Sequence, residues 1–469
     1  MKKQMSKRIE SDLLGDKEIP KDAYYGVQTQ RALENFDISW ARLDAHPRFI
    51  KALGAVKIAA ARANNQLGVL DEKLSDAIIQ AGEEVMAGKF DKEFPIDMIQ
   101  GGAGTSTNMN VNEVIANRAN EILGGKKGEY KYVTPNDHVN LSQSTNDAYP
   151  TAIKIALMEM NEDMIIHLKD LINSFRNKGK EFAHVLKMGR TQLQDAVPMT
   201  LGQEFEAYAA TLEEEVTRLR QNADLFKEIN MGATAIGTGI NSVPGYAEVC
   251  TRELGLVVNQ RFMLAANLVE ATPDTGSYVI YSSAMKRLAV KLSKISNDLR
   301  LLSSGPRAGF GEINLPKMQP GSSIMPGKVN PVIPEVVNQV CFKVIGNDLT
   351  VTFAAEAGQL QLNVMEPVIV QSIMESIKLL ENAMDTFRTK AIDGITANEE
   401  VCMNMVKNSI GIVTALNPYI GYKASSKIAK EALETGRGVY DLVLEHKLLT
   451  KEKLDDILRP EKMIRPHKF

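Results

Sequence analysis

Apolar residues recur at three- and four-residue steps in five long stretches of the chain. This spacing lines one face of an α-helix with core-facing side chains, whereas strand-like alternation is sparse. Each helical window covers roughly 25 to 35 residues, about twice the usual helix length, and would reach about 40–50 Å. The pattern predicts a mainly helical, all-α fold, and the apolar sets lie within residues 153–175, 205–226, 285–302, 330–345 and 370–387.

The fourth window is apolar nearly all round. A helix without a polar face is usually buried on every side, and packing against other copies of the chain achieves this readily. We therefore expect a central long-helix bundle domain over residues 147–390, completed by self-association. The flanks carry shorter helical windows, so we expect an N-terminal helical domain over 1–146 and a small C-terminal helical domain over 391–469.

The composition and charge of the chain argue against some classes of binding partner. The 469 residues are 44% apolar and 24% charged, with a net charge of −3, which gives no reason to expect nucleic acid or membrane-surface binding. Residues 1–16 are charged and lack the apolar centre of a signal peptide, and no apolar run approaches the length of a membrane helix. Three widely spaced cysteines fit reduced, buried thiols. We expect a cytoplasmic protein.

Four polar loops each run into a helical window. They are 101–108 (GGAGTSTN), 142–147 (SQSTND), 188–195 (MGRTQLQD) and 321–331 (GSSIMPGKVNP). Taken singly, such a loop is usually only a helix cap, because Ser, Thr, Asn, Asp and Gly all cap helices. Four loops richer in hydroxyls and amides than caps require favour a different interpretation. Helix N-termini that converged in space would form a cage for a dianion.

The loop 321–331 has the clearest anion-binding character. Asn330 is a suitable N-cap and Pro331 suits the first helical position, so a helix is expected to begin there. Lys328 stands beside that helix N-terminus, where an anion is stabilised. The glycine-rich stretch 232–239 does not follow a convincing strand, so a dinucleotide site is not expected. The six histidines show no metal-ligand spacing, and no cofactor is expected.

These loops resemble the fumarase/aspartase superfamily, and the resemblance covers nearly the whole chain. The family signature GSSxxPxKxNxxxxE is met from Gly321 to Glu335, and SQSTND and GRTxLQDA are similar to its two other active-site segments. The resemblance implies a homotetramer with a bundle of long helices and active sites shared between three subunits. It also implies an elimination across a Cα–Cβ bond that releases fumarate through an enediolate intermediate.

Gln192 is the residue that helps to distinguish elimination of ammonia from elimination of water. Class II fumarases have His at this position, whereas part of the aspartase group has Gln in the same context, GRTQLQDAVPM. The resemblance therefore implies elimination of ammonia from L-aspartate, with fumarate hydratase activity as the alternative. An ammonium group leaves as neutral ammonia without a proton donor, and a Gln carbonyl can accept its hydrogen bond. A non-catalytic relative is a further alternative, but its expected damage to the Ser322 loop is not seen.

The resemblance also implies residue roles. Ser322 is similar to the general base that takes the Cβ proton. Further residues would bind the β-carboxylate (Thr105, Ser144, Thr145 and Ser323), the α-carboxylate (Lys328 and Asn330) and the amino group (Asn146, Thr191 and Gln192). Glu335 would lie behind the substrate contacts, with no His to pair with.

Overall fold

Helices dominate the computed structural model, which describes residues 6–464, so the expected all-α class is confirmed. Each of the five predicted windows contains a long helix. Their bounds are α5 Thr145–Glu181, α6 Leu201–Ala223, α9 Gly276–Leu302, α10 Val332–Glu356 and α11 Glu366–Lys390. Within the described part of the chain, no helix is both long and apolar enough to cross a membrane.

Shorter helices occupy both flanks, as the sequence predicts. On the N-terminal side they are α1 Val27–Asn35, α2 Pro47–Gln66, α3 Glu72–Met86 and α4 Thr105–Ile122. Between α6 and α9 lie α7 Tyr246–Val258 and α8 Leu268–Ala271. On the C-terminal side they are α12 Glu399–Asn408, α13 Asn417–Ile420, α14 Tyr422–Thr435, α15 Val439–Glu445, α16 Lys451–Ile457 and α17 Pro460–Met463.

Strands occur only as short pairs among residues 6–464. The pairs are β1 Lys7–Asp12 with β2 Gly15–Pro20, β3 Leu186–Thr191 with β4 Gln194–Thr200, β5 Glu228–Ile229 with β6 Met263–Leu264, and β7 Ile313–Asn314 with β8 Thr396–Ala397. Only β5 and β6 are parallel. The β3–β4 hairpin was not predicted, because its loop was expected to run directly into a helix.

The chain forms two compact units. Unit 1 comprises Met1–Ile165, Thr217–Arg287 and Lys343–Leu379, and unit 2 comprises Ile166–Val216, Leu288–Phe342 and Leu380–Phe469. Both units include parts of the long helices. The three domains expected from the sequence follow a different division, which stays a prediction.

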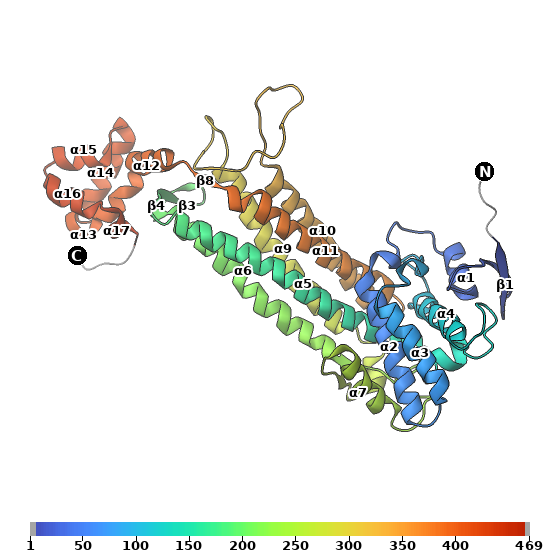
Figure 1. Ribbon diagram of the computed structural model, residues 1–469. Coiled ribbons are helices and arrows are strands. Elements are labelled where there is room, and N and C mark those ends of the chain that lie inside the picture. The colour runs from blue at the N-terminus through green and yellow to red at the C-terminus, as the bar shows by residue number, and fades with distance from the viewer. Residues whose placement is uncertain (1–5, 465–469) are drawn as a thin grey trace. The chain divides into compact units, whose positions relative to one another are not determined.

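In unit 1, α2 packs against α3, α4 and α7 (Figure 1). The α2 segment is buried over most of its length because Ala, Val, Ile and Leu recur along it. Lys57 lies in the middle of this segment and is also fully buried. A lysine is almost never buried without partners, so this position identifies a polar cluster inside the unit.

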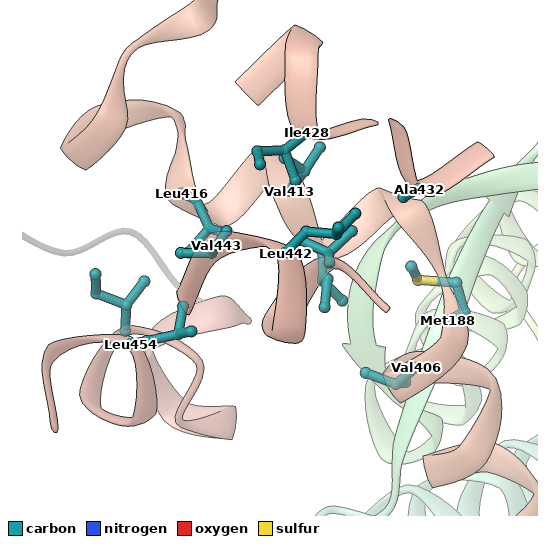
Figure 2. Packing of buried hydrophobic residues seen from close by; sticks show 12 residues of the cluster. Met188, Val406, Val413, Leu416, Ile428, Ala432, Leu442, Val443 and Leu454 are labelled. Carbon is teal, nitrogen blue, oxygen red and sulfur yellow. The ribbon is translucent and has the colours of Figure 1, made fainter. Parts of the chain in front are cut away.

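In unit 2, aromatic side chains join the ends of three long helices. Phe175 of α5 contacts Phe205 and Tyr208 of α6 and Phe387 of α11, with ring centroids 5.8–6.1 Å apart. A second apolar cluster joins the C-terminal helices to the β3–β4 hairpin through Met188 (Figure 2). The hairpin therefore rests on a packed base, and the residues of its turn are exposed.

Candidate active site

In unit 1, two of the polar loops become the N-termini of neighbouring helices. Thr105 is the first residue of α4, and Thr145 is the first residue of α5. Asn108, one turn into α4, donates a hydrogen bond from Nδ2 to Thr145 Oγ1 at 3.2 Å. Two helix N-termini thus lie together, which is the arrangement expected of an anion site.

The start of α5 is held by reciprocal capping. Ser144 Oγ accepts from the Asn146 backbone N–H at 3.2 Å, and Asp147 Oδ1 accepts from the Ser144 backbone N–H at 3.0 Å. This is the capping-box arrangement. It fixes the hydroxyls of Ser144 and Thr145 and the carboxamide of Asn146 on one short segment.

The glycine-rich segment 232–239 supports this capping from behind. Gly232 and Thr234 donate their backbone N–H groups to Asp147 Oδ2 at 3.2 and 2.9 Å. Asn146 Nδ2 donates to the carbonyl of Ala235 at 2.7 Å. Burial raises the pKa of Asp147 to about 6, against the opposing effect of these backbone hydrogen bonds and of Lys57. Sequence reasoning missed this role, because the segment was considered only as a dinucleotide motif.

Lys57 is a second feature that sequence reasoning missed. Its Nζ donates to Asn108 Oδ1 at 2.7 Å, Asn140 Oδ1 at 3.3 Å and Gln143 Oε1 at 2.8 Å. Three ammonium hydrogens therefore meet three neutral amide oxygens. Burial lowers the pKa of Lys57 to about 7, opposed by Asp147. The available signal was a lysine in the middle of the apolar stretch 52–61.

In unit 2, Thr191 and Gln192 lie at the tip of the β3–β4 hairpin. Thr191 pairs with Gln194, so Gln192 and Leu193 form a two-residue turn, with φ values of 55° and 61°. Left-handed φ at both positions is typical of a type I′ turn, which normally selects Asn and Gly. Non-glycine residues held in this backbone region are strained by about 1–3 kcal/mol each, and such residues are common at functional sites. The Gln192 side chain is exposed.

A buried ion-pair cluster anchors the base of this hairpin. Glu312 is fully buried, and its carboxylate lies 2.8 Å from Lys187 Nζ and 2.7 Å from Arg190 Nη1. Lys187 also contacts Glu204 at 2.6 Å, and the Arg190 guanidinium lies 4.2 Å from the centre of the Phe310 ring. The cluster connects the strand that carries Thr191 to the segment that precedes the Ser322 loop.

Residues 321–330 form a loop that closes on itself within unit 2. The Gly321 N–H donates to the Lys328 carbonyl at 2.7 Å, and Asn330 Nδ2 donates to the Gly321 carbonyl at 2.8 Å. A side chain at Gly321 would meet the Lys328 carbonyl at 2.7 Å, so only glycine fits this close approach. Gly327 has φ 81°, and the residues from Ser323 to Val329 are exposed.

Ser322 Oγ points back into its own loop. It accepts hydrogen bonds from the backbone N–H groups of Ile324 at 3.2 Å and Met325 at 2.9 Å. Hydrogen bonds to the charged form of a group favour ionisation. This arrangement therefore supplies the kind of donor that a serine base requires.

The start of α10 departs from the sequence expectation. The helix begins at Val332, and the Asn330 carboxamide donates to Gly321 instead of accepting from the first turn. The expected N-cap at Asn330 is therefore wrong, and Asn330 closes the loop instead. Lys328 and Ser323 are exposed on the loop, and Glu335 is half-buried in the first turn of α10.

The predicted site residues thus fall into two sets. Unit 1 holds Thr105, Ser144, Thr145 and Asn146, and unit 2 holds Thr191, Gln192, Ser322, Ser323, Lys328, Asn330 and Glu335. Within unit 1, Ser144, Thr145 and Asn146 are adjacent on one capped segment. No group of three or more His, Cys, Asp or Glu side chains among the described residues is arranged to hold a metal ion.

Comparison with known proteins establishes the family. A model of the lyase family matches residues 15–346, and a model of the fumarase C C-terminus matches residues 412–465. The chain belongs to the fumarase/aspartase superfamily of lyases. It is therefore a lyase, as the resemblance of its loops implied.

Curated members of this superfamily match almost end to end. Aspartate ammonia-lyases from Helicobacter pylori and Pseudomonas aeruginosa are 60% and 61% identical to the chain. Each match covers 98% of this chain, and it covers 99% and 98% of those proteins, respectively. The Escherichia coli aspartate ammonia-lyase is 56% identical, over 98% of this chain and 96% of its own length.

Solved superfamily structures share the fold. A fumarate lyase:delta crystallin from Brucella melitensis bound to cobalt matches with a TM-score of 0.96 and 54% identity, covering 98% of this chain and 100% of its own. A class II fumarase from Schistosoma mansoni matches with a TM-score of 0.93 and 37% identity, over 99% and 100% of the two chains.

Proposed function

We propose that this superfamily member is an aspartate ammonia-lyase, which reversibly eliminates ammonia from L-aspartate to give fumarate. The observation that carries the proposal is 56–61% identity, over almost the whole chain, to curated aspartate ammonia-lyases. The similar class II fumarase is more distant, at 37% identity. Gln192, where the resemblance places His in class II fumarases, favours the same choice.

Ser322 is the proposed base. Its Oγ, ionised with the help of the Ile324 and Met325 N–H groups, takes the proton from Cβ. The electron pair of that C–H bond moves onto the β-carboxylate, which becomes an enediolate with a second negative charge. When the pair returns to form the Cα–Cβ double bond, the Cα–N bond breaks and its electrons leave with nitrogen as ammonia.

Hydroxyl donors are proposed to stabilise the enediolate. Thr105, Ser144 and Thr145 in unit 1 and Ser323 in unit 2 would bind the β-carboxylate. Donors fixed in place beforehand bind the more charged transition state better than the ground state. The reciprocal capping of Ser144 and Asp147 supplies such fixation.

The other end of the substrate would be bound by the remaining loop residues. Lys328 and Asn330 are proposed to bind the α-carboxylate. Thr191, Gln192 and Asn146 would surround the amino group, where the Gln192 carbonyl accepts a hydrogen bond from ammonium. Glu335 is proposed to act behind these contacts.

We further propose a homotetramer in which each active site takes residues from three subunits. The support is an exposed apolar face on α10, where Phe342, Leu349 and Phe353 are 61%, 55% and 65% exposed. They follow the i, i+7, i+11 spacing of one helix face, and Gly346 between them has open space before it. Such a face is typical of a surface that another chain covers. The expected cytoplasmic location stays a prediction.

The oligomer is tested by placing a charge on this face. Phe353→Asp should convert a four-chain particle into smaller species, because a buried unpaired carboxylate opposes association. Light scattering during size-exclusion chromatography measures the mass of each, and Glu356→Gln at the end of the same helix is the control. A wild-type protein that runs as a single chain would contradict the proposal.

The activity is tested by following the absorbance of fumarate as it forms from L-aspartate, with D-aspartate and L-malate as controls. We expect fumarate from L-aspartate alone. In the reverse direction, fumarate with ammonium should give aspartate. Formation of malate from fumarate in water, with no aspartate when ammonium is added, would identify a fumarase instead.

Ser322→Ala tests the base in the same assay. Turnover should be abolished while aspartate binding, measured by calorimetry, is largely kept. Ser303→Ala is the matched control, since within residues 6–464 the Ser303 hydroxyl donates only to the Arg300 carbonyl, at 3.3 Å. Near-normal turnover in Ser322→Ala would refute the assignment.

A further inference from the structure

A buried lysine lies behind the proposed β-carboxylate donors, and the mechanism above does not use it. Lys57 Nζ donates to Asn108 Oδ1 at 2.7 Å, and Asn108 Nδ2 donates in turn to Thr145 Oγ1 at 3.2 Å. All three residues belong to unit 1 and are at least nine-tenths buried. One amide side chain therefore connects a buried cation to a hydroxyl at the helix N-terminus.

The direction of these successive hydrogen bonds follows from which groups can donate. An ammonium group can only donate, so it fixes the Asn108 oxygen towards Lys57. The Asn108 NH₂ group then donates to Thr145 Oγ1 and also to Asn140 Oδ1, at 3.0 Å. Thr145 Oγ1 then accepts, and its own O–H remains to donate. No acceptor within residues 6–464 takes that hydrogen in the structure, so it is available to a ligand.

We propose that Lys57 and Asn108 form a hydrogen-bond relay that aims and polarises the Thr145 hydroxyl towards the β-carboxylate of the substrate. This inference rests on the proposed function and adds two positioning residues to it. Hydrogen bonds in a chain strengthen one another, and a cation at the far end makes the final O–H a stronger donor. The effect is greatest when the carboxylate gains its second charge.

The surroundings of Lys57 support a role beyond packing. Its nearest partners are three neutral amides, and the ionisable groups that act on it are Asp147 of α5 and Cys250 of α7. Burial lowers the pKa of Lys57 to about 7, so the charge is held only weakly in the free protein. A dicarboxylate bound nearby would favour the charged form.

The test exchanges the relay amide for a carboxylate. In Asn108→Asp, the new carboxylate accepts from Lys57 and also from the Thr145 O–H, which turns that hydroxyl away from the substrate. The new charge has Lys57 as its partner, so the fold is kept. We expect kcat for L-aspartate to fall by about 10²-fold, with a smaller change in KM, as for a lost transition-state donor.

A double-mutant cycle separates the relay from a structural effect. Thr145→Val removes the hydroxyl and should lower kcat by about 10²–10³-fold, whereas Thr145→Ser should restore most of it. If Asn108 acts through Thr145, the double variant Asn108→Asp, Thr145→Val should be no slower than Thr145→Val, within about threefold. Asn112→Asp is the matched control. Asn112 lies on the same helix as Asn108 and donates to Asn140 Oδ1 at 3.1 Å, but it does not contact Thr145.

Each outcome decides the proposal. Losses that multiply in the double variant, or equal losses in Asn108→Asp and Asn112→Asp, would overturn the relay while leaving the aspartate activity in place. Wild-type protein that forms no fumarate from L-aspartate would overturn the proposed function, and the relay with it.

Discussion

The buried Glu312 offers a quantitative test of how the β3–β4 hairpin is held. Glu312→Gln keeps the shape of the side chain and removes its charge. The wild-type carboxylate is fully buried, 2.8 Å from Lys187 Nζ and 2.7 Å from Arg190 Nη1. The variant leaves these two cations close together in a poorly solvated site.

The expected magnitude follows from the remaining partners. Removing one member of a buried ion pair typically destabilises a protein by about 3–5 kcal/mol. Lys187 keeps Glu204 at 2.6 Å, and Arg190 keeps the face of the Phe310 ring at 4.2 Å. These contacts still stabilise part of the positive charge on Lys187 and Arg190, so we expect a loss of about 3 kcal/mol in the free energy of unfolding.

The assay is urea unfolding at a fixed protein concentration. The control is Glu213→Gln, which removes a half-exposed ion pair with Arg176 and should change stability by about 0–1 kcal/mol. Glu312→Gln should also lower turnover, because the strained turn at Gln192 loses its anchored base. A stability within about 1 kcal/mol of the control would refute the reasoning.

Two further predictions concern the loop and a buried carboxyl. Lys328→Ala should mainly raise KM for L-aspartate, because an exposed cation at the proposed α-carboxylate site contributes to binding. Steady-state kinetics measure KM, and an unchanged value would contradict the assignment. Burial raises the pKa of Glu366 to about 8 from 4.5, opposed by Lys154. In this pH range the folded protein retains a proton that the unfolded chain loses. The contribution of Glu366 to the free energy of unfolding is therefore present at low pH and declines as the pH rises from about 4.5 to about 8. Glu366→Gln should remove that decline, by on the order of 4 kcal/mol at most, and thermal unfolding at pH 5 and 8 compares the two proteins; equal pH dependence would contradict the shift.

The long helices could be predicted because their periodicity extends over many turns. The apolar set within residues 370–387, for example, lies inside α11, Glu366–Lys390. The β3–β4 hairpin could not be predicted, because its turn uses Gln192 and Leu193 in place of the usual Asn and Gly. Local residue preference is overridden there by packing of the strands on the C-terminal cluster.

The candidate site was predictable in its loops but not in its supports. Hydroxyls and amides at helix starts are visible in the sequence, and the family resemblance assigns Ser144 and Thr145 a substrate-binding role that stays a prediction. Lys57 and Asp147 act through distant segments, and only folding brings residues 232–235 to the Asp147 carboxylate. Asn330 was misjudged as a cap because its amide serves the loop closure instead.

The left-handed turn at the hairpin tip limits which side chains can occupy position 192, the proposed contact to the amino group of the substrate. With φ 55° at Gln192, β-branched side chains are disfavoured there, whereas Asn, Asp and His tolerate this region comparatively well. An exchange between Gln and His therefore requires no rebuilding of the backbone. The hairpin tip can therefore present either side chain at the proposed amine-binding position, while the buried cluster around Glu312 keeps the turn in place.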